Sequence, residues 1–326
     1  GEAEVPVPED VRHNLDALKM CYLALRKARE RRGAIDFETI EVDIAFDESG
    51  KIAGMSPISR NEAHRLIEEC MLAANVCAAE FVGEADHPVL YRVHDGPTAE
   101  KLGALKEFLH DFGLKLGGGD KPSPSDFAQV LEDIRESKEQ NLIQTVLLRS
   151  LSQARYCPDN SGHFGLAYKQ YAHFTSPIRR YPDLLVHRVI KAVLRGERYE
   201  PGNWAVLGQH CSFCERRAED ASRDVGNWLK CHFMKDRAGE RLSGVISGIA
   251  SFGVFVTLDD FFVEGMVHVS DLGADYFVFD PKRHRLLGER TGLQFRIGDN
   301  MDVRIARVDV DAQKIELLPD RPGDTA

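Results

Sequence analysis

The sequence predicts an α+β fold in two domains: helices and a few strands over residues 1–238, then an all-β domain over 239–320 and a tail at 321–326. Two patterns along the chain predict this division. In the first part, apolar residues recur mainly at three- and four-residue steps, as on one face of a helix. From Arg241 onward, short runs of alternating apolar and polar residues are separated by glycines, as in β-strands joined by turns.

The first domain begins with a helix predicted over residues 8–31. Pro8 suits the first turn, acidic residues follow it, and Gly33 lies where the periodic pattern ends. Ser59 and Glu62 have the capping-box spacing that starts a second helix, which runs to about residue 82. The same reasoning predicts helices at 98–114, 125–137, 139–155, 183–195 and 203–236, and strands at 40–46, 88–95 and 164–174.

The composition limits how this protein could bind nucleic acid and in which compartment we expect it. The formal net charge is -10, with 32 Lys and Arg against 38 Asp and Glu in residues 1–240 and 10 against 14 in residues 241–326. Because such a surface repels phosphate, any binding of nucleic acid must use local basic surfaces or base stacking. The seven cysteines are an odd number, which favours the reducing cytoplasm over a disulfide framework. We expect neither a signal peptide nor membrane association, since no apolar run approaches about 18 residues.

One segment concentrates the charged and polar chemistry of the chain: residues 171–183, with the sequence YAHFTSPIRRYPD. Thr175 or Ser176 is a good N-cap and Pro177 suits the first helical position, so we expect the two arginines that follow to lie in the first turn of a helix. Backbone N–H groups and the helix dipole favour an anion there. Two guanidinium groups at such a place are unfavourable unless something negative binds, and an arginine fork matches a phosphate.

The chain stays basic after this segment. Residues 169–195 contain six Lys and Arg residues and one acid, Asp183. Arg188 and Lys191 share one face of the predicted helix, opposite an apolar face. The pattern indicates either a phosphate-binding surface or a set of surface ion pairs with acids elsewhere in the fold.

The sequence HFTSPIRRYPD at residues 173–183 resembles the signature of the catalytic (RNB) domain of the ribonuclease II and ribonuclease R family of exoribonucleases, with bacterial ribonuclease R the closer match. Other stretches that resemble the family are GAIDFE at 33–38, HRLIEECM at 64–71, HFGL at 163–166 and ERRA at 215–218. The resemblance covers nearly the whole chain. It implies the C-terminal part of the catalytic domain followed by a C-terminal RNA-binding OB-fold.

For function, the resemblance implies processive 3′-to-5′ hydrolysis of RNA with release of nucleoside 5′-monophosphates. Two divalent cations, expected to be Mg²⁺, would activate water and stabilise the leaving oxygen. Single-stranded RNA is the expected partner, and structured RNA is a further candidate.

The family motif also implies roles for individual residues. Arg179 is the expected catalytic residue, which holds the phosphate next to the 3′-terminal nucleotide. Phe37 would stack on the terminal bases, and Glu68 or Glu69 would contact riboses. By spacing alone, Phe37 is more often a core residue, and Glu69 lies four residues after Arg65 as in a helix-surface ion pair. The expected RNA contacts in the basic segment are Arg180, Arg188 and Lys191.

The family's metal site uses a closely spaced cluster of aspartates near the start of the catalytic domain, and this sequence contains no such cluster. Its Asp-Asp pair, Asp259-Asp260, falls in the C-terminal domain. We therefore expect the metal ligands upstream of Gly1, in a missing N-terminal half that would be a partner of this chain. By itself the chain is expected to be catalytically inactive and to expose apolar surface where that half would pack.

The C-terminal domain resembles the RNA-binding OB-fold of the ribosomal protein S-one type, with five short strands expected between residues 244 and 317. Val254 and Val256 alternate with Phe255, so Phe255 points to the opposite face of its strand. The alternative is that the phenylalanines of this strand belong to the core. The basic insertion at 271–297 is a further candidate for contacts with the RNA backbone. The expected RNA-binding residues of this domain are Phe252, Phe255, His268 and Lys314.

A zinc site is the alternative interpretation of Cys211-x-x-Cys214. Both cysteines fall on the predicted buried stripe of the helix at 203–236, and structural zinc sites usually pair two such knuckles. We therefore expect no metal ligands in this chain. Two functional hypotheses remain: part of an exoribonuclease, or a catalytically inactive RNA-binding fragment or regulator.

Overall fold

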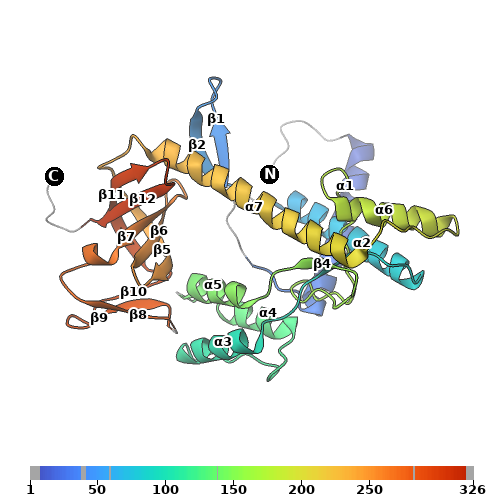
Figure 1. Ribbon diagram of the computed structural model, residues 1–326, viewed down its shortest axis with the longest axis horizontal. Coiled ribbons are helices and arrows are strands. Elements are labelled where there is room, and N and C mark those ends of the chain that lie inside the picture. Colours follow the sequence, from blue (N-terminus) through green and yellow to red (C-terminus); the bar gives the residue numbers. More distant parts are fainter. Residues whose placement is uncertain (1–7, 38–41, 59, 138, 282, 321–326) are drawn as a thin grey trace.

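The computed structural model confirms the α+β fold and describes residues 8–37, 42–58, 60–137, 139–281 and 283–320. A helical body and a β-barrel are connected by one long helix, α7 (Trp204–Met234), which runs diagonally across the molecule (Figure 1). Within the described ranges, none of the helices combines the length and the apolar character that crossing a lipid bilayer requires.

The helical body precedes α7 in the chain and is accompanied by two short antiparallel strand pairs. Its helices are α1 (Glu9–Arg32), α2 (Glu62–Glu84), α3 (Ala99–Asp111), α4 (Pro124–Asp133), α5 (Gln140–Ser150) and α6 (Tyr181–Leu194). The strands β3 (Tyr91–Val93) and β4 (Arg155–Cys157) form one pair within this body. The strands β1 (Val42–Phe46) and β2 (Ile52–Pro57) form the other pair, which lies near the barrel end of α7 (Figure 1), where Met55 packs against the barrel core. The helix predicted at 8–31 is confirmed as α1, which Gly33 ends in the left-handed conformation at φ 70°.

Two predictions of local structure in this body are wrong. The N-cap of α2 is Asn61, whose side chain accepts a hydrogen bond from the His64 backbone N, while the His64 ring accepts one from the Asn61 N. Ser59, the predicted cap, lies outside the described residues. Residues 164–174 form no strand, because the chain turns back on itself: the Ala167 N donates to the Phe164 O, and Ala167 has a φ of 55°.

Separate apolar clusters hold the helical body together. One lies between α3, α4 and α5 and includes the fully buried Leu105, Phe127 and Leu147. Another joins α2 to α6 through contacts that include Val82 and Val186. Burial of each such side chain contributes about 1.5–3 kcal/mol relative to exposure.

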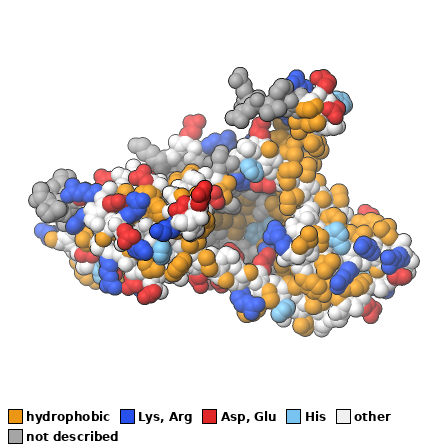
Figure 2. All heavy atoms as spheres, turned by 90° about the horizontal axis from the view of Figure 1, so that it is seen from above, with side chains coloured by type: hydrophobic (Ala, Val, Ile, Leu, Met, Phe, Trp, Pro, Cys, Tyr) orange, Lys and Arg blue, Asp and Glu red, His pale blue; other side chains and the backbone are white. Residues whose placement is uncertain are grey.

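Much apolar surface is nevertheless exposed. On α1, Val11, Leu15 and Leu18 are 41%, 49% and 42% exposed, although their spacing predicted a buried face. In the middle of α7, Val225 and Trp228 are exposed as well, so the predicted buried stripe of that helix is wrong over this stretch. The view in Figure 2 shows broad areas of hydrophobic side chains and a hollow between the two bodies. The sequence led us to expect some exposed apolar surface, but not that it would lie on α1.

The C-terminal body is a closed five-stranded barrel in which each strand pairs with two neighbours, in the order β11-β12-β7-β6-β5. Its strands are β5 (Arg241–Ala250), β6 (Gly253–Leu258), β7 (Glu264–His268), β11 (Asn300–Asp309) and β12 (Lys314–Pro319). The insertion between β7 and β11 contains the short helix η1 (Val269–Asp271) and a separate sheet of β8 (Phe277–Asp280), β9 (Arg285–Gly288) and β10 (Gln294–Arg296).

The insertion also connects the barrel to the helical body. Ile297, just after β10, is 5% exposed and belongs to the same apolar cluster as the core residues of α3, α4 and α5. The Arg283 Nε lies 2.7 Å from the Asp111 Oδ2 at the end of α3, and the His284 ring contacts the Phe108 ring edge-on. These contacts, together with the packing of Cys231 and Met234 of α7 in the barrel core, hold the barrel against the rest of the molecule.

Candidate RNA-binding and phosphate-binding site

The segment that contains Arg179 and Arg180 forms a hydrogen-bonded turn before helix α6 and is not part of that helix. Helix α6 begins at Tyr181, and the backbone N atoms of Arg179 and Arg180 both donate to the Ser176 O, at 3.3 and 3.0 Å. The predicted helix start at Pro177 is therefore wrong. A helix that began there would place Pro182 in its interior, where proline removes a hydrogen bond and clashes with the preceding turn at a cost of about 3 kcal/mol.

The two adjacent arginines have opposite environments. Arg179 is exposed, and within the described part of the chain its guanidinium forms no hydrogen bond or ion pair. The Arg180 side chain is 19% exposed, and its Nη2 donates to the Oδ1 of the fully buried Asp183 at 2.8 Å. Of these two arginines, only Arg179 presents an unengaged guanidinium to solvent, as a phosphate ligand requires.

The remaining basic residues of this region lie on the outer face of α6. Arg188 is exposed, and its Nη1 donates to the Tyr199 hydroxyl at 3.0 Å. Lys191 is exposed one turn later. The basic surface predicted along this helix therefore exists, although Arg188 is partly occupied by Tyr199.

Behind the turn lies a buried network of aromatic and charged side chains that the sequence did not indicate. The Tyr156 hydroxyl lies 2.9 Å from the His173 Nδ1 and 3.4 Å from the Glu215 Oε1, and Arg92 forms an ion pair with Glu215 at 2.6 Å. Burial lowers the pKa of His173 to about 2, with Arg180 and Arg92 adding to the effect. His173 is therefore neutral at physiological pH and contacts Tyr156 as a hydrogen-bonding group rather than as a charge.

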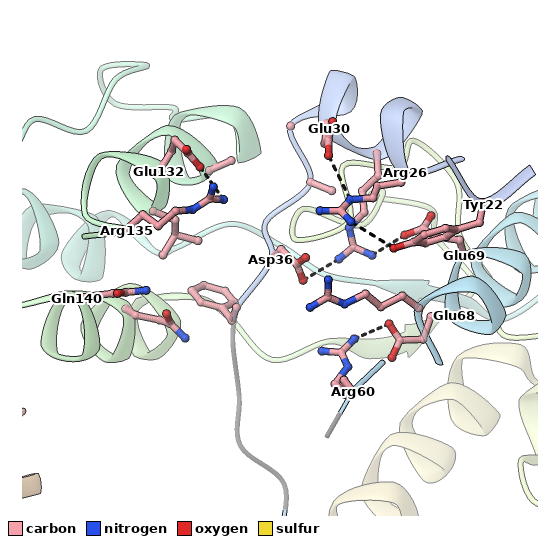
Figure 3. Close-up of a pocket in the computed structure, with 18 residues that line it drawn as sticks. Tyr22, Arg26, Glu30, Asp36, Arg60, Glu68, Glu69, Glu132, Arg135 and Gln140 are labelled. Carbon is pink, nitrogen blue, oxygen red and sulfur yellow. Dashed lines mark hydrogen bonds and ion pairs between the residues drawn. The ribbon is translucent and has the colours of Figure 1, made fainter. Parts of the chain in front are cut away.

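A cavity of about 540 Å³ lies between α1 and α2 on one side and α4 and α5 on the other, and Phe37 contributes to its lining. Figure 3 shows Tyr22, Arg26, Glu68 and Glu69 facing Arg135 and Gln140 across it. The lining contains arginines and acids in equal numbers: Arg26, Arg29, Arg60, Arg65 and Arg135, with Glu30, Asp36, Glu68, Glu69 and Glu132.

The three residues predicted to contact RNA near this cavity all line it. Phe37 is half-buried and packs against the core of α3, α4 and α5, as its spacing alone suggested. Its stacking on RNA bases stays a prediction. Glu69 is 6% exposed and pairs with Arg29 at 3.0 Å, and Glu68 pairs with Arg60. The alternative pairing of Glu69 with Arg65 is not the one the structure shows.

On the barrel, Phe252, Phe255 and His268 lie close together. Val254 and Val256 are fully buried, so the alternation that turns Phe255 away from the core is confirmed. Phe252 is 49% exposed and meets the Phe255 ring edge-on, with ring centroids 6.0 Å apart. Strand pairing places His268 opposite Gly253, next to Phe252.

Lys314 is separated from this aromatic group. The parallel pairing of β12 with β7 places Glu316 opposite Met266, so Lys314 lies two residues farther toward the end of the barrel away from His268. The arginines of the insertion are also engaged within the protein: Arg283 with Asp111, Arg285 with Asp280, and Arg290 with the Ala274 O. Lys282 lies outside the described residues. The aromatic group is therefore the stronger candidate for RNA contact on this domain.

Among the described residues, no three His, Cys, Asp or Glu side chains converge in a way that could hold a metal ion. Cys211 and Cys214 lie partly exposed on α7, where the Cys214 Sγ is 3.5 Å from the His210 Nε2. The acid nearest the two arginines in sequence, Asp183, is already paired with Arg180.

Comparison with known proteins gives consistent matches for both bodies. The RNB domain matches residues 1–196, and the S1 RNA binding domain matches residues 235–318. Ribonuclease R of Escherichia coli (strain K12) is 48% identical over 320 residues, which cover 94% of this chain and 39% of the relative. Ribonuclease R of Vibrio cholerae is 46% identical over 318 residues, which cover 93% of this chain and 39% of that one.

The fold agrees with these matches. The apo form of Mycoplasma genitalium RNase R has a TM-score of 0.90 and 25% identity, covering 98% of this chain and 51% of that one. The chain thus spans about two-fifths of the length of the curated relatives above. Since the RNB domain matches more than half of its residues, the chain belongs to the RNB family of exoribonucleases.

Proposed function

We propose that these residues form the phosphate-binding and RNA-holding part of a 3′-to-5′ exoribonuclease that releases nucleoside 5′-monophosphates. The observation that carries the proposal is Arg179, an exposed guanidinium without a protein partner in the described part of the chain, on a turn tied to buried side chains. Such a preorganised cation stabilises negative charge as it develops on a reacting phosphate. Arg180 and Asp183, by contrast, neutralise one another.

We propose single-stranded RNA as the substrate and the cytoplasm as the location. A structural neighbour, Mycoplasma genitalium RNase R, is known in complex with ribose methylated single-stranded RNA, at 25% identity to this chain. The Phe252 and Phe255 rings at the barrel surface support single-stranded RNA as the substrate, because unpaired bases stack on such rings whatever their identity. The odd number of cysteines supports a reducing compartment.

We further propose that the reaction uses Mg²⁺ held by carboxylates outside these 326 residues. Phosphodiester hydrolysis by paired cations needs several converging acidic ligands. The acids of the large cavity are already balanced by arginines, as Glu69 is by Arg29.

The test is an assay of the purified 326-residue chain beside a longer protein that also contains the residues aligned with the N-terminal part of its relatives. We expect the chain alone to bind labelled single-stranded RNA in a salt-sensitive way without releasing nucleoside monophosphates. The longer protein should release them, and EDTA should abolish that release.

Two results would contradict the proposal. Magnesium-dependent release by the chain alone, at the rate of the longer protein, would place the metal ligands within these residues. Binding of RNA by the longer protein without any release would instead favour a catalytically inactive RNA-binding protein.

We expect Phe255→Ala in the longer protein to weaken the binding of single-stranded RNA by about 1–3 kcal/mol, because it removes one stacking surface. Single-turnover cleavage at saturating RNA should stay near normal, since the barrel supplies affinity and not chemistry. Filter binding at fixed salt measures the effect. Phe277→Ala is the control, because Phe277 is 7% exposed and belongs to the core of the C-terminal body. Phe277→Ala should lower the melting temperature, whereas Phe255→Ala should not. Unchanged affinity in Phe255→Ala would remove this ring from the RNA path.

A further inference from the structure

A fully buried carboxylate lies directly behind the exposed arginine. Asp183, in the first turn of α6, has no exposed surface. Its Oδ1 accepts hydrogen bonds from the backbone N of Ser176 at 2.7 Å and from the Arg180 Nη2 at 2.8 Å. One oxygen atom therefore ties together the two ends of a short turn. The residues between these ends are Pro177, Ile178 and Arg179.

The chain that enters this turn is held by a second buried side chain, from α2. The Asn75 Oδ1 accepts hydrogen bonds from the backbone N of Phe174 at 2.9 Å and of Thr175 at 3.2 Å. Asn75 is 3% exposed, and its Nδ2 donates to the Tyr171 hydroxyl at 3.0 Å. The backbone N–H groups of three consecutive residues, 174–176, thus end on buried side chains. Since buried amides require partners, this segment has little freedom to move.

The buried ion pair of Arg180 and Asp183 is not expected to add much to the stability of the fold. The cost of removing a carboxylate and a guanidinium from water largely offsets their attraction, so such a pair contributes more to the choice of one conformation than to the free energy of folding. Here the chosen conformation separates two neighbouring arginines. Arg180 is turned inward onto Asp183, and Arg179 is left facing solvent beside the fully exposed Ile178.

We propose that Asp183 is a positioning residue for the phosphate-binding arginine: by engaging Arg180 and the Ser176 backbone, it fixes the turn that presents Arg179 to RNA. The inference rests on the proposed function, because presentation of Arg179 matters only if that residue binds the reacting phosphate. It gives the two arginines different roles. Arg179 contacts substrate, whereas Arg180 holds the turn.

The positioning role of Asp183 depends on a single hydrogen bond between its side chain and Arg180. The Asp183 Oδ2 and the Arg180 Nε are buried without a partner among the described residues, so the pair is joined by one hydrogen bond and not by the two-bond fork that arginine and carboxylate can form. The Thr175 Oγ1 in the same segment is likewise buried and unpaired within the described ranges. The turn therefore depends on the Asp183 Oδ1, and loss of the carboxylate charge is sufficient to loosen it.

The test uses Asp183→Asn in the complete exoribonuclease. The amide keeps an oxygen that can accept from Ser176 but removes the charge that holds Arg180. We expect kcat on single-stranded RNA to fall about tenfold, as for a misplaced catalytic group, while the dissociation constant for RNA changes less than about twofold. In an Arg179→Ala background, the same substitution should cause no further fall in kcat, because its effect passes through Arg179.

Leu185→Ala is the matched control, because Leu185 is as buried as Asp183, lies on the same helix and packs against Leu90 and Tyr156. It should lower the melting temperature and leave kcat unchanged where the protein is folded. If Asp183→Asn does not fold, Arg180→Lys tests the same contact from its other side and should lower kcat to a similar extent.

Two results would overturn the proposal: an equal fall in kcat with and without Arg179, or a fall in Leu185→Ala as large as that in Asp183→Asn. An Arg179→Ala enzyme with unchanged kcat would identify a failure of the proposed function itself.

Discussion

In the longer protein, replacing Arg179 by alanine is expected to lower kcat of the proposed exoribonuclease reaction about 100-fold and to change the affinity for RNA little. The guanidinium is exposed and unpaired in the described part of the chain, on a turn that buried side chains hold in place. A preorganised charge of this kind is typically worth about 3 kcal/mol in the transition state. Affinity changes less, because many contacts along the strand contribute to it. Single-turnover kinetics at saturating RNA measure the chemical step, and filter binding measures affinity.

Arg195→Ala is the control for charge alone. Arg195 is exposed at the opposite end of α6, so its loss changes the net charge equally but leaves the turn intact. Its kcat should stay within about twofold of the parent. A kcat within threefold of the parent for Arg179→Ala would rule out the catalytic role of this residue.

Local patterns in the sequence predicted the structure correctly at positions where a single physical rule applied. Gly33 ends α1 because its left-handed conformation suits glycine, and the alternation in β6 correctly placed Phe255 opposite the buried valines. The helical first turn predicted at Pro177 does not form, because two prolines compete. Pro177 is a suitable first residue of a helix, but Pro182 cannot lie in the interior of one, so the helix starts later and the arginines occupy a turn.

The supports of the turn could not be predicted, because they come from distant parts of the chain. Asn75 lies about 100 residues before Thr175, and nothing in the α2 sequence marks it as a partner of that backbone. Asp183 carried one visible signal, as the single acid in a basic segment, but the sequence does not tell a buried acid from an exposed one. Periodicity reports which face of a helix is apolar and not which of those faces finds a partner, so the exposed side of α1 was unexpected.

The second large effect is expected at Ile297, where the barrel meets the helical body. Ile297→Asp would place a carboxylate in the apolar cluster formed with α3, α4 and α5. Burial of an unpaired charge, together with the loss of the isoleucine side chain, should destabilise this interface by about 4 kcal/mol or more. The other contacts of the insertion with α3 include the Arg283–Asp111 ion pair and the edge-on contact of the His284 ring with Phe108. A surface ion pair contributes about 0–1 kcal/mol and a ring pair about 0.5–1.5 kcal/mol, so they do not compensate. We expect the unfolding transition to separate into two, since the bodies would no longer unfold as one unit.

Two substitutions serve as controls for that experiment. Ile297→Val removes one methylene and should cost about 1 kcal/mol with a single transition retained. Leu293→Asp introduces the same charge into the insertion at a residue that is 48% exposed, so it should leave both the midpoint and the shape of the transition nearly unchanged. Calorimetry and urea unfolding followed by tryptophan fluorescence measure these effects, with Trp228 on α7 and Trp204 at its start as the reporters. If Ile297→Asp unfolds in one transition with the midpoint of the parent, the barrel is not held by this contact, and its orientation must depend on α7 instead.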